Sequence, residues 1–427
     1  MSSILSLHAR EIFDLKGIPT IEVELTTQNG KFVSSVPSGS SKGFYEAVEL
    51  RDNDEKRLSG KGVLNAVNNV NTLISNELIG KNIFNQKELD EIMIKLDGTK
   101  NKSKLGANAI LACSMCISRA AASAKKVPLF KYLADLTGHK LTSFPIPFFN
   151  LITGGQHANN GLVLQEIMIC PTKANSFKES YIMGMEVFHC MEKIIEKKYG
   201  KEWGAIAVSG GYAPPIYDWK EGFELVNEAI NDAGYTGKIQ MAIDMAASDF
   251  YIKSMKKYDI GYKFPENLKN PNQIKDADEL ISEYINLLEI YPIISFEDPF
   301  DENDWDAWVK FKKILNEKYN KVQVTGDDLT VTNPKRLKIA IQKKAINSII
   351  IKMNQIGTLT ETFETIRLAQ ENGFKIIASH RSGETEDNYI AHLSIGLNCD
   401  QIKTSPLCRT NNELLRIEEE RMNYENN

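Results

Sequence analysis

The chain has 427 residues, and 51 Lys and Arg against 56 Asp and Glu give a formal net charge of −5. This length favours two or three domains, and the 42% hydrophobic and 25% charged residues exclude an intrinsically disordered chain. The apolar stretches at 108–117 and 145–152 are too short to span a bilayer, and the N-terminus has no secretory signal. Without a basic patch for nucleic acid, the sequence predicts a soluble cytoplasmic protein that binds neither membrane nor nucleic acid.

The six cysteines are scattered along the chain and do not have the spacing of a disulfide framework. Cys113 and Cys116 form a C-x-x-C motif, but they lie in a run of good helix formers. No second pair or nearby His completes a zinc site. We therefore expect a buried helical face at this motif and six reduced thiols.

The first part of the chain predicts an antiparallel meander followed by helices. β-forming runs at 21–25 and 32–36 flank the turn signal Gln28-Asn29-Gly30. Helical periodicity follows in three stretches, at 59–77, 86–97 and 104–124. Ser103 is the expected N-cap of the third helix. The pattern predicts an α+β N-terminal domain, with a boundary that we set at residues 1–142.

From residue 143 to 427 the pattern changes to alternating strands and helices. Six short β-rich runs each end near a polar residue, at Asp244, Glu297, Asp327, Lys352, His380 and Lys403. After the first step, these residues are 23 to 30 positions apart, close to one strand–helix–strand unit of about 30 residues. Consecutive units of this kind predict an α/β fold, a β/α barrel in which the strand ends meet on one side.

The strand-end residues together predict a metal site. A single acidic residue after a strand is usually a helix cap or a solvated loop residue. Three converging carboxylates without a metal would repel one another and raise their pKa values, and oxygen-only ligands favour Mg²⁺. Lys352 and Lys403 indicate an anionic substrate and a lysine base whose pKa is lowered by the neighbouring cation.

Five stretches of the sequence resemble signature motifs of the enolase family, in the family's order, within a likeness that runs from about residue 4 to 420. They are Leu105–Leu111, Ser295–Phe300, Asp327–Asn333, Lys352–Leu359 and Ser379–Asp387. The resemblance implies an α+β capping domain followed by an enolase-type β/α barrel. It also implies the dehydration of 2-phospho-D-glycerate to phosphoenolpyruvate in glycolysis, two Mg²⁺ ions per active site, and a cytoplasmic homodimer.

The resemblance also implies a role for each matching residue. Asp244, Glu297 and Asp327 would bind one Mg²⁺, and Ser38, in a loop that closes over the substrate, would help to hold the second. Lys352 would be the general base, and Lys403 would contact the substrate carboxylate. Arg381 and Ser382 would bind the phosphate, and Ser379 would also contact the substrate. His157, Glu166 and His380 would complete the polar wall, and His380 is counted among the catalytic residues.

One catalytic position departs from the family. Enolases carry Asp-Glu-Gly-Gly, and this chain has Val208-Ser209-Gly210-Gly211, so Ser209 stands where the general acid Glu is expected. A serine hydroxyl is a far weaker acid than a carboxyl group, and a positioned general acid contributes about 10²–10⁴-fold in rate. We therefore expect impaired dehydration unless Glu166 or Glu202 acts instead.

Lesser departures concern a mobile loop and the dimer contact. Thr153 replaces an Asn of the family, and Asn159 and Asn160 replace glycines in a loop that must close over substrate. Lys16 replaces an arginine, and the segment 404–413 is shortened. Both regions belong to the dimer contact in enolases, so we expect an altered interface.

Two functions stay open from the sequence. The chain is either an enolase with impaired turnover or a catalytically weak or inactive enolase-fold protein that binds or regulates. Ser209 separates these alternatives. A different acid-sugar dehydratase is less favoured, because the phosphate-binding run Arg381-Ser382 is present.

Overall fold

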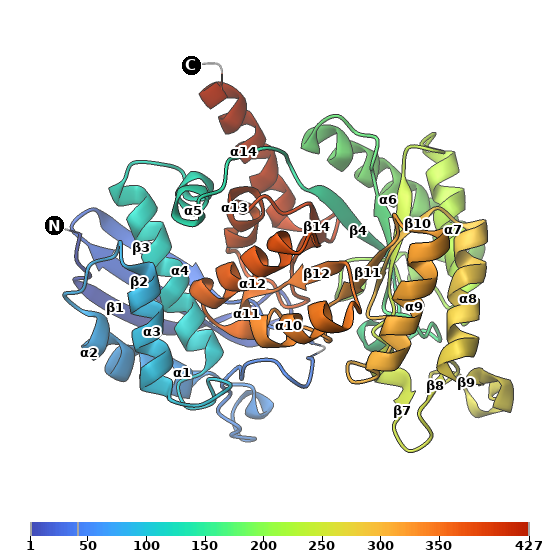
Figure 1. Ribbon diagram of the computed structural model, residues 1–427, viewed down its shortest axis with the longest axis horizontal. Coiled ribbons are helices and arrows are strands. Elements are labelled where there is room, and N and C mark those ends of the chain that lie inside the picture. The colour runs from blue at the N-terminus through green and yellow to red at the C-terminus, as the bar shows by residue number, and fades with distance from the viewer. Residues whose placement is uncertain (1, 41, 426–427) are drawn as a thin grey trace.

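The computed structural model describes residues 2–40 and 42–425, and side chains as far as residue 421. Its N-terminal part is a three-stranded sheet covered by helices, and its C-terminal part is a closed barrel (Figure 1). The sheet is antiparallel in the order β1-β2-β3, with β1 (Ser6–Phe13), β2 (Pro19–Thr27) and β3 (Gly30–Ser35). The prediction of an α+β unit followed by a β/α barrel is confirmed.

The N-terminal helices lie close to the predicted positions. They are α1 (Leu64–Asn69), η2 (Val70–Ile74), α2 (Ser75–Leu78), α3 (Gln86–Asp97), α4 (Ala107–Ala124) and α5 (Leu129–Thr137). The prediction that Ser103 caps α4 is wrong. The Asp97 carboxylate accepts hydrogen bonds from the backbone of Lys104 and Leu105 at 3.1 and 2.7 Å, which holds this segment in a turn. The helix therefore begins later, after Gly106.

Helix α4 is the core of the N-terminal part and packs against β2 and β3. Among the described residues it is the one helix long and apolar enough to cross a membrane, but 83% of it is buried inside the molecule. Such burial is typical of the core helix of a globular domain. Cys113 and Cys116 are both buried on it, and all six cysteines are free thiols, as predicted.

Eight strands close the barrel in the order β4-β5-β6-β10-β11-β12-β13-β14. They are β4 (Ile146–Thr153), β5 (Glu166–Cys170), β6 (Gln240–Asp244), β10 (Ile293–Glu297), β11 (Gln323–Gly326), β12 (Ser348–Ile351), β13 (Lys375–Ser379) and β14 (Gln401–Thr404). Neighbouring strands are parallel except β5, which is antiparallel to both β4 and β6.

The reversed direction of β5 brings its first residue to the functional end of the barrel. Glu166 pairs with Thr153, the last residue of β4, and with Asp244, the last residue of β6. A residue at the start of a parallel strand would lie at the opposite end. Glu166 is therefore placed beside the strand-end residues by topology.

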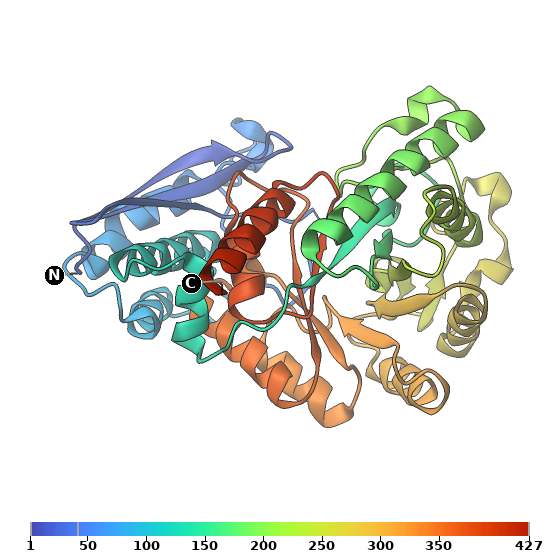
Figure 2. The same cartoon turned by 90° about the horizontal axis from the view of Figure 1, so that it is seen from above.

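Helices surround the barrel on its outer side (Figure 2). They are α6 (Phe177–Tyr199), α7 (Trp219–Asp232), α8 (Ala277–Ile290), α9 (Trp305–Lys318), α10 (Pro334–Lys343), α11 (Met353–Ile356), α12 (Leu359–Glu371), α13 (Tyr389–Gly396) and α14 (Arg409–Glu425). A small sheet contains β7 (Tyr251–Ile252), β8 (Lys257–Asp259) and β9 (Ile274–Lys275). Short 3-10 turns are η1 (Leu58–Gly60), η3 (Gly155–His157), η4 (Lys201–Gly204), η5 (Ala247–Phe250), η6 (Glu266–Leu268) and η7 (Pro271–Gln273).

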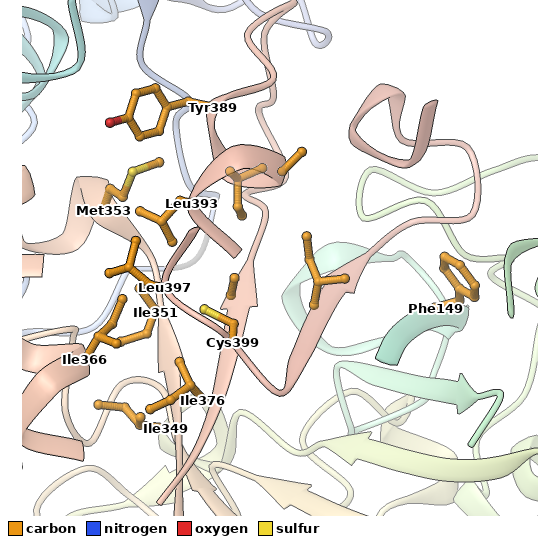
Figure 3. Packing of buried hydrophobic residues seen from close by; sticks show 14 of the residues in the cluster. Phe149, Ile349, Ile351, Met353, Ile366, Ile376, Tyr389, Leu393, Leu397 and Cys399 are labelled. Carbon is orange, nitrogen blue, oxygen red and sulfur yellow. The ribbon is translucent and has the colours of Figure 1, made fainter. Parts of the chain in front are cut away.

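Apolar side chains fix the helices on the strands. Figure 3 shows Ile349 and Ile351 of β12 and Ile376 of β13 near Ile366 of α12 and Leu393 of α13. All five are buried and belong to one large hydrophobic cluster. Burying each such side chain contributes about 1.5–3 kcal/mol, so this packing holds the strand ends, and the polar residues on them, in fixed positions.

Polar contacts join the N-terminal part to the barrel. Ser118 of α4 shares a 2.7 Å hydrogen bond with the hydroxyl of Tyr389, and the neighbouring Arg119 pairs with Asp387 at 2.6 Å. The buried Asp90 of α3 accepts hydrogen bonds from the backbone and hydroxyl of Thr360. These contacts press the N-terminal part against the barrel end that carries the strand-end residues.

Candidate active site

A polar cavity lies at the carboxyl ends of the barrel strands. Of the residues predicted for the site, all except Glu297 and Ser38 line it: His157, Glu166, Ser209, Asp244, Asp327, Lys352, Ser379, His380, Arg381, Ser382 and Lys403. Gly39, Ser40, Gln165, Ala246, Asp298 and Asp328 complete the lining. The strand-end positions therefore converge, as the barrel pattern predicts.

The two lysines lie among the carboxylates. The Lys403 ammonium donates to Asp244 at 2.7 Å and to both oxygens of Glu297 at 2.8 Å, and its nitrogen lies 3.0 Å from Glu166. The Lys352 ammonium contacts Asp327. The single charge of Lys403 is shared by three carboxylates, so it offsets only part of the cost of burying them.

These contacts change the protonation expected from the sequence. Burial is the largest single effect and disfavours the ammonium of Lys352, but the nearby carboxylates, Asp327 first and then Glu297, together raise the pKa of Lys352 above its usual value. The same pair lowers the pKa of Asp327 against the effect of burial. The predictions of a lowered lysine pKa and of a raised pKa at Asp327 are therefore wrong. For Glu297, burial followed by the charge of Asp244 raises the pKa, as predicted.

A second carboxylate group adjoins the first. One oxygen each from Asp298, Asp327 and Asp328 lie within 4.8 Å of one another. Asp298 accepts hydrogen bonds from the backbone of Asp327 and Asp328 at 2.9 and 2.7 Å, which fixes its orientation. Asp327 belongs to both groups, and all the ligand atoms are carboxylate oxygens. This set fits a hard divalent cation such as Mg²⁺.

Both histidines of the cavity are neutral at pH 7. Burial lowers the pKa of His157 to about 4 and that of His380 to about 3, and the neighbouring lysines add to the effect at His380. His157 Nδ1 lies 4.0 Å from a carboxylate oxygen of Glu166. Both ring nitrogens of His157 are buried and have no hydrogen-bond partner among the described residues. A neutral imidazole in this position can donate and accept hydrogen bonds to a ligand without adding charge.

The His157 loop is held from two sides by residues that the sequence did not single out as anchors. The Lys263 ammonium donates to the backbone oxygens of Gly155 and Ala158 at 2.5 and 2.7 Å. The Asn160 amide donates to the backbone oxygens of Thr153 and Pro214 at 2.9 and 3.1 Å. Asn160 replaces a family glycine and here provides a tether, so the substitution has a structural explanation.

Ser209 belongs to a cluster of neutral polar side chains. It is 3% exposed, and its hydroxyl lies 3.0 Å from the Asn150 amide and 3.1 Å from the Thr153 hydroxyl. The Asn150 amide also donates to Thr153 at 3.0 Å and to Glu166 at 3.3 Å. The sequence showed Ser209 and Thr153 as separate departures, and the structure brings them into contact.

The two carboxylates proposed as substitute acids lie in different places. Glu166 lines the cavity and is linked to Ser209 through Asn150. Burial raises the pKa of Glu166. Glu202 is exposed on η4 and is absent from the cavity lining. Of the two, only Glu166 is near enough to take part in the chemistry.

The loop at residues 37–40 covers one end of the cavity. The guanidinium of Arg381 donates to Glu46 at 3.2 Å and to Asn354 at 3.0 Å. Gly39 lies directly against Arg381, where a Cβ atom would stand 1.7 Å from a guanidinium nitrogen. The Ser38 hydroxyl donates to Glu49 at 3.1 Å, outside the lined cavity, while Ser40 lines it.

Comparisons with known proteins agree over nearly the full chain. The model of the enolase N-terminal domain matches residues 4–133, and that of the enolase C-terminal TIM barrel domain matches residues 141–426. Enolase 1 of Entamoeba histolytica is 57% identical over 423 residues, which cover 98% of this chain and 96% of that protein. The enolase of Mastigamoeba balamuthi is 50% identical over 425 residues, with the same coverage. The chain therefore belongs to the enolase family and is, by family, a phosphopyruvate hydratase, a carbon–oxygen lyase.

Proposed function

We propose that the chain binds 2-phospho-D-glycerate with Mg²⁺ in this cavity and converts it to phosphoenolpyruvate in glycolysis, at a rate limited by Ser209. The observation that carries the proposal is the convergence of Lys352, Lys403 and Arg381 with carboxylates at one end of the barrel. This arrangement matches an anionic substrate that carries a carboxylate and a phosphate.

The carboxylates Asp244, Glu297 and Asp327 would hold one ion, and the resemblance assigns a second ion near Ser38. Bound Mg²⁺ would supply Lewis-acid stabilisation of the negative charge that develops on the substrate carboxylate. Asp298 and Asp328 are further oxygen ligands within reach of Asp327. Their backbone hydrogen bonds keep this side of the site rigid.

Lys352 would take the proton next to the substrate carboxylate. To accept a proton it must first lose its own, and the contact with Asp327 opposes that loss by raising its pKa. The contact must therefore loosen when the site is loaded. Lys403 would stay charged, because Asp244, Glu166 and Glu297 surround it and raise its pKa against the effect of burial.

The departing hydroxyl would receive poor assistance. The Ser209 hydroxyl is engaged by Asn150 and Thr153. Those neighbours orient the hydroxyl, but none is an acid of useful strength at pH 7. Loss of the general acid corresponds to about 10²–10⁴-fold in rate, so proton abstraction would be preserved better than elimination.

A second function, as a weakly active or inactive binding or regulatory protein, is supported by the same cluster. A fully hydrogen-bonded Ser209 gives a stable wall for a bound ligand without supplying a proton.

In either case we propose a cytoplasmic homodimer with an interface altered at residues 404–413. We also propose a division into domains at residues 1–142 and 143–427.

Product formation with and without Mg²⁺ tests the proposal. We expect phosphoenolpyruvate to form from 2-phospho-D-glycerate slowly, only with Mg²⁺, and not in the Lys352→Met variant. The exposed Lys31→Gln change on β3 is the matched control and should leave the rate unchanged. Binding of 2-phospho-D-glycerate without any product would favour the binding protein, and absence of binding would contradict both functions.

A further inference from the structure

We propose that Lys16 is a phosphate-binding residue of this site and that its ammonium group supplies, beside Arg381, a second positive charge for the phosphate of the substrate. The inference rests on the proposed function and deepens it. The sequence assigned Lys16 to the subunit interface, because the family carries an arginine there. The contacts of its side chain point to a different role.

The β1–β2 turn carries Lys16 to the cavity. The Asp14 carboxylate accepts hydrogen bonds from the backbone of Lys16 and Ile18 at 2.8 and 2.9 Å, and Gly17 provides a φ of +70°. The backbone of Leu15 donates to the backbone oxygen of Glu384 at 2.9 Å. The turn is thereby fixed to the loop that follows Arg381.

The ammonium of Lys16 donates hydrogen bonds to two serine hydroxyls at the end of the cavity where the phosphate would bind. Its nitrogen is 2.7 Å from the Ser40 hydroxyl and 3.4 Å from the Ser382 hydroxyl. The Ser382 hydroxyl donates to the Ser40 hydroxyl at 2.9 Å, and the backbone N–H of Ser40 donates to the Ser382 hydroxyl at 2.9 Å. Both serines line the cavity together with Arg381.

The charges around this end favour an added cation. A phosphate monoester carries a charge of about −1.5 to −2 at pH 7. The Arg381 guanidinium already pairs with the Glu46 carboxylate at 3.2 Å, and the side chains are 4% and 9% exposed. The pair is close to neutral as a unit. Among the described residues, the hydrogen bonds of the Lys16 ammonium go only to the two serine hydroxyls.

Burial lowers the pKa of Lys16, and the carboxylates of Asp14 and Glu49 act against this effect. At hydrogen-bond distance the ammonium contacts neutral hydroxyls, which a phosphate oxygen can replace. A serine hydroxyl can exchange its partner for a phosphate oxygen at little cost, because the hydroxyl both donates and accepts. Charge-assisted hydrogen bonds from ammonium to phosphate are about twice as strong as neutral ones. Ser40 and Ser382 would therefore bind the phosphate together with Lys16, which adds one positive charge to that of Arg381.

Binding measurements on the full chain with Mg²⁺ test the assignment. The probes are 2-phospho-D-glycerate, inorganic phosphate and D-glycerate, which lacks the phosphate. The variants are Lys16→Met, which removes the ammonium, Lys16→Gln, which keeps a hydrogen-bond donor without the charge, and Lys16→Arg, which keeps the charge. Lys31→Gln changes the net charge equally on an exposed part of β3 and is the matched control.

We expect Lys16→Met and Lys16→Gln to weaken binding of 2-phospho-D-glycerate and inorganic phosphate by about 10- to 100-fold, the range for a hydrogen bond to a charged group. Binding of D-glycerate should not change, and Lys16→Arg should lose much less. Where turnover is measurable, KM should rise while kcat stays, because the contact exists before and during the reaction.

The outcomes separate the inference from the proposed function. Phosphate affinity within twofold of the unmodified chain in Lys16→Gln would overturn the inference, as would an equal loss for D-glycerate. If a Lys16 variant changes the molecular mass measured by light scattering but binds phosphate with unchanged affinity, Lys16 belongs to the subunit contact and the inference is wrong. Tight phosphate binding that depends on Lys16, without product, would keep the inference and contradict the enzymatic function.

Discussion

The cavity has two walls of different chemistry. One wall carries ions in contact, with Lys352 on Asp327 and Lys403 among Asp244, Glu166 and Glu297. The other consists of the neutral side chains Asn150, Thr153 and Ser209, which hydrogen-bond one another. The first wall has the groups needed to bind an anion and to remove a proton. The second wall has hydroxyls and an amide where the resemblance in the sequence leads us to expect an acid.

If the proposed function holds, the two walls predict that proton removal is retained while expulsion of the hydroxyl is weakened. Removing the proton requires a base and stabilised charge, which the ionic wall supplies. Expelling the hydroxyl requires a proton donor on the opposite side. The contact between Thr153 and Ser209 also indicates that the neutral wall is a packed unit, in which a single restored residue would lack its partner.

The largest expected effect comes from removing the base. Lys352→Met should lower exchange of the substrate proton by about 10⁴-fold, because Lys403, the other lysine that lines the cavity, is surrounded by three carboxylates that raise its pKa and keep it protonated. Proton exchange in deuterated buffer, followed by NMR, measures this loss. Exchange that survives in the variant would mean that another residue removes the proton, and the assignment of proton removal to Lys352 of the ionic wall would be wrong.

Restoring the neutral wall should have the next largest effect. Thr153→Asn combined with Ser209→Glu should raise phosphoenolpyruvate formation by about 10²-fold, since it returns a carboxylic acid and the residue that contacts it. Ser209→Glu alone should gain less, because residues in contact do not act additively. Equal gains from the single and double variants would show that the Thr153 contact is irrelevant.

Acid pH should destabilise the folded chain through His157. Burial lowers its pKa from 6.5 to about 4. Between these values the unfolded chain binds more protons, so stability falls as the pH drops through this window, by at most about 3 kcal/mol. His157→Gln should reduce the loss of stability between pH 7 and pH 4.5 in chemical denaturation, and the part that remains should include the contribution of the buried His380. An unchanged slope would contradict a neutral, buried His157.

The smallest expected effect concerns the tether of the His157 loop. Lys263→Met removes two hydrogen bonds to backbone oxygens and should raise KM for 2-phospho-D-glycerate by about 10-fold, because the loop must then be ordered on binding. Lys269→Met lies in the same segment and is the control, because the described ion pair of Lys269 is with the exposed Glu266 at 2.8 Å. Equal KM values in both variants would show that Lys263 does not order the His157 loop for substrate binding.

The sequence predicted the barrel and the convergence of its strand ends because each of six strands ends at or beside an ionisable residue. It missed β1, in which polar and apolar residues alternate only over the first five positions, Ser-Leu-His-Ala-Arg, before the pattern is lost. It also missed β4 and β5, the first two strands of the barrel, and with them the reversed direction of β5. The cavity position of Glu166 depends on that reversal.

Contacts between distant residues were beyond the sequence. The opposite pKa shifts of Lys352 and Asp327 follow from a contact that spacing alone does not reveal. The link between Thr153 and Ser209 joins residues 56 positions apart. Lys16 reaches Ser382 across 366 positions. In each case the missing information was side-chain direction, which only the folded chain supplies.

The ratio of proton exchange to product formation tests the difference between the two walls most directly. Unmodified protein with Mg²⁺ and 2-phospho-D-glycerate in deuterated buffer should exchange the substrate proton much faster than it forms phosphoenolpyruvate. The double variant Thr153→Asn and Ser209→Glu should bring the two rates together. Equal rates in the unmodified protein would contradict the account, because they would mean that the neutral wall, or Glu166 beside it, already supplies an effective acid.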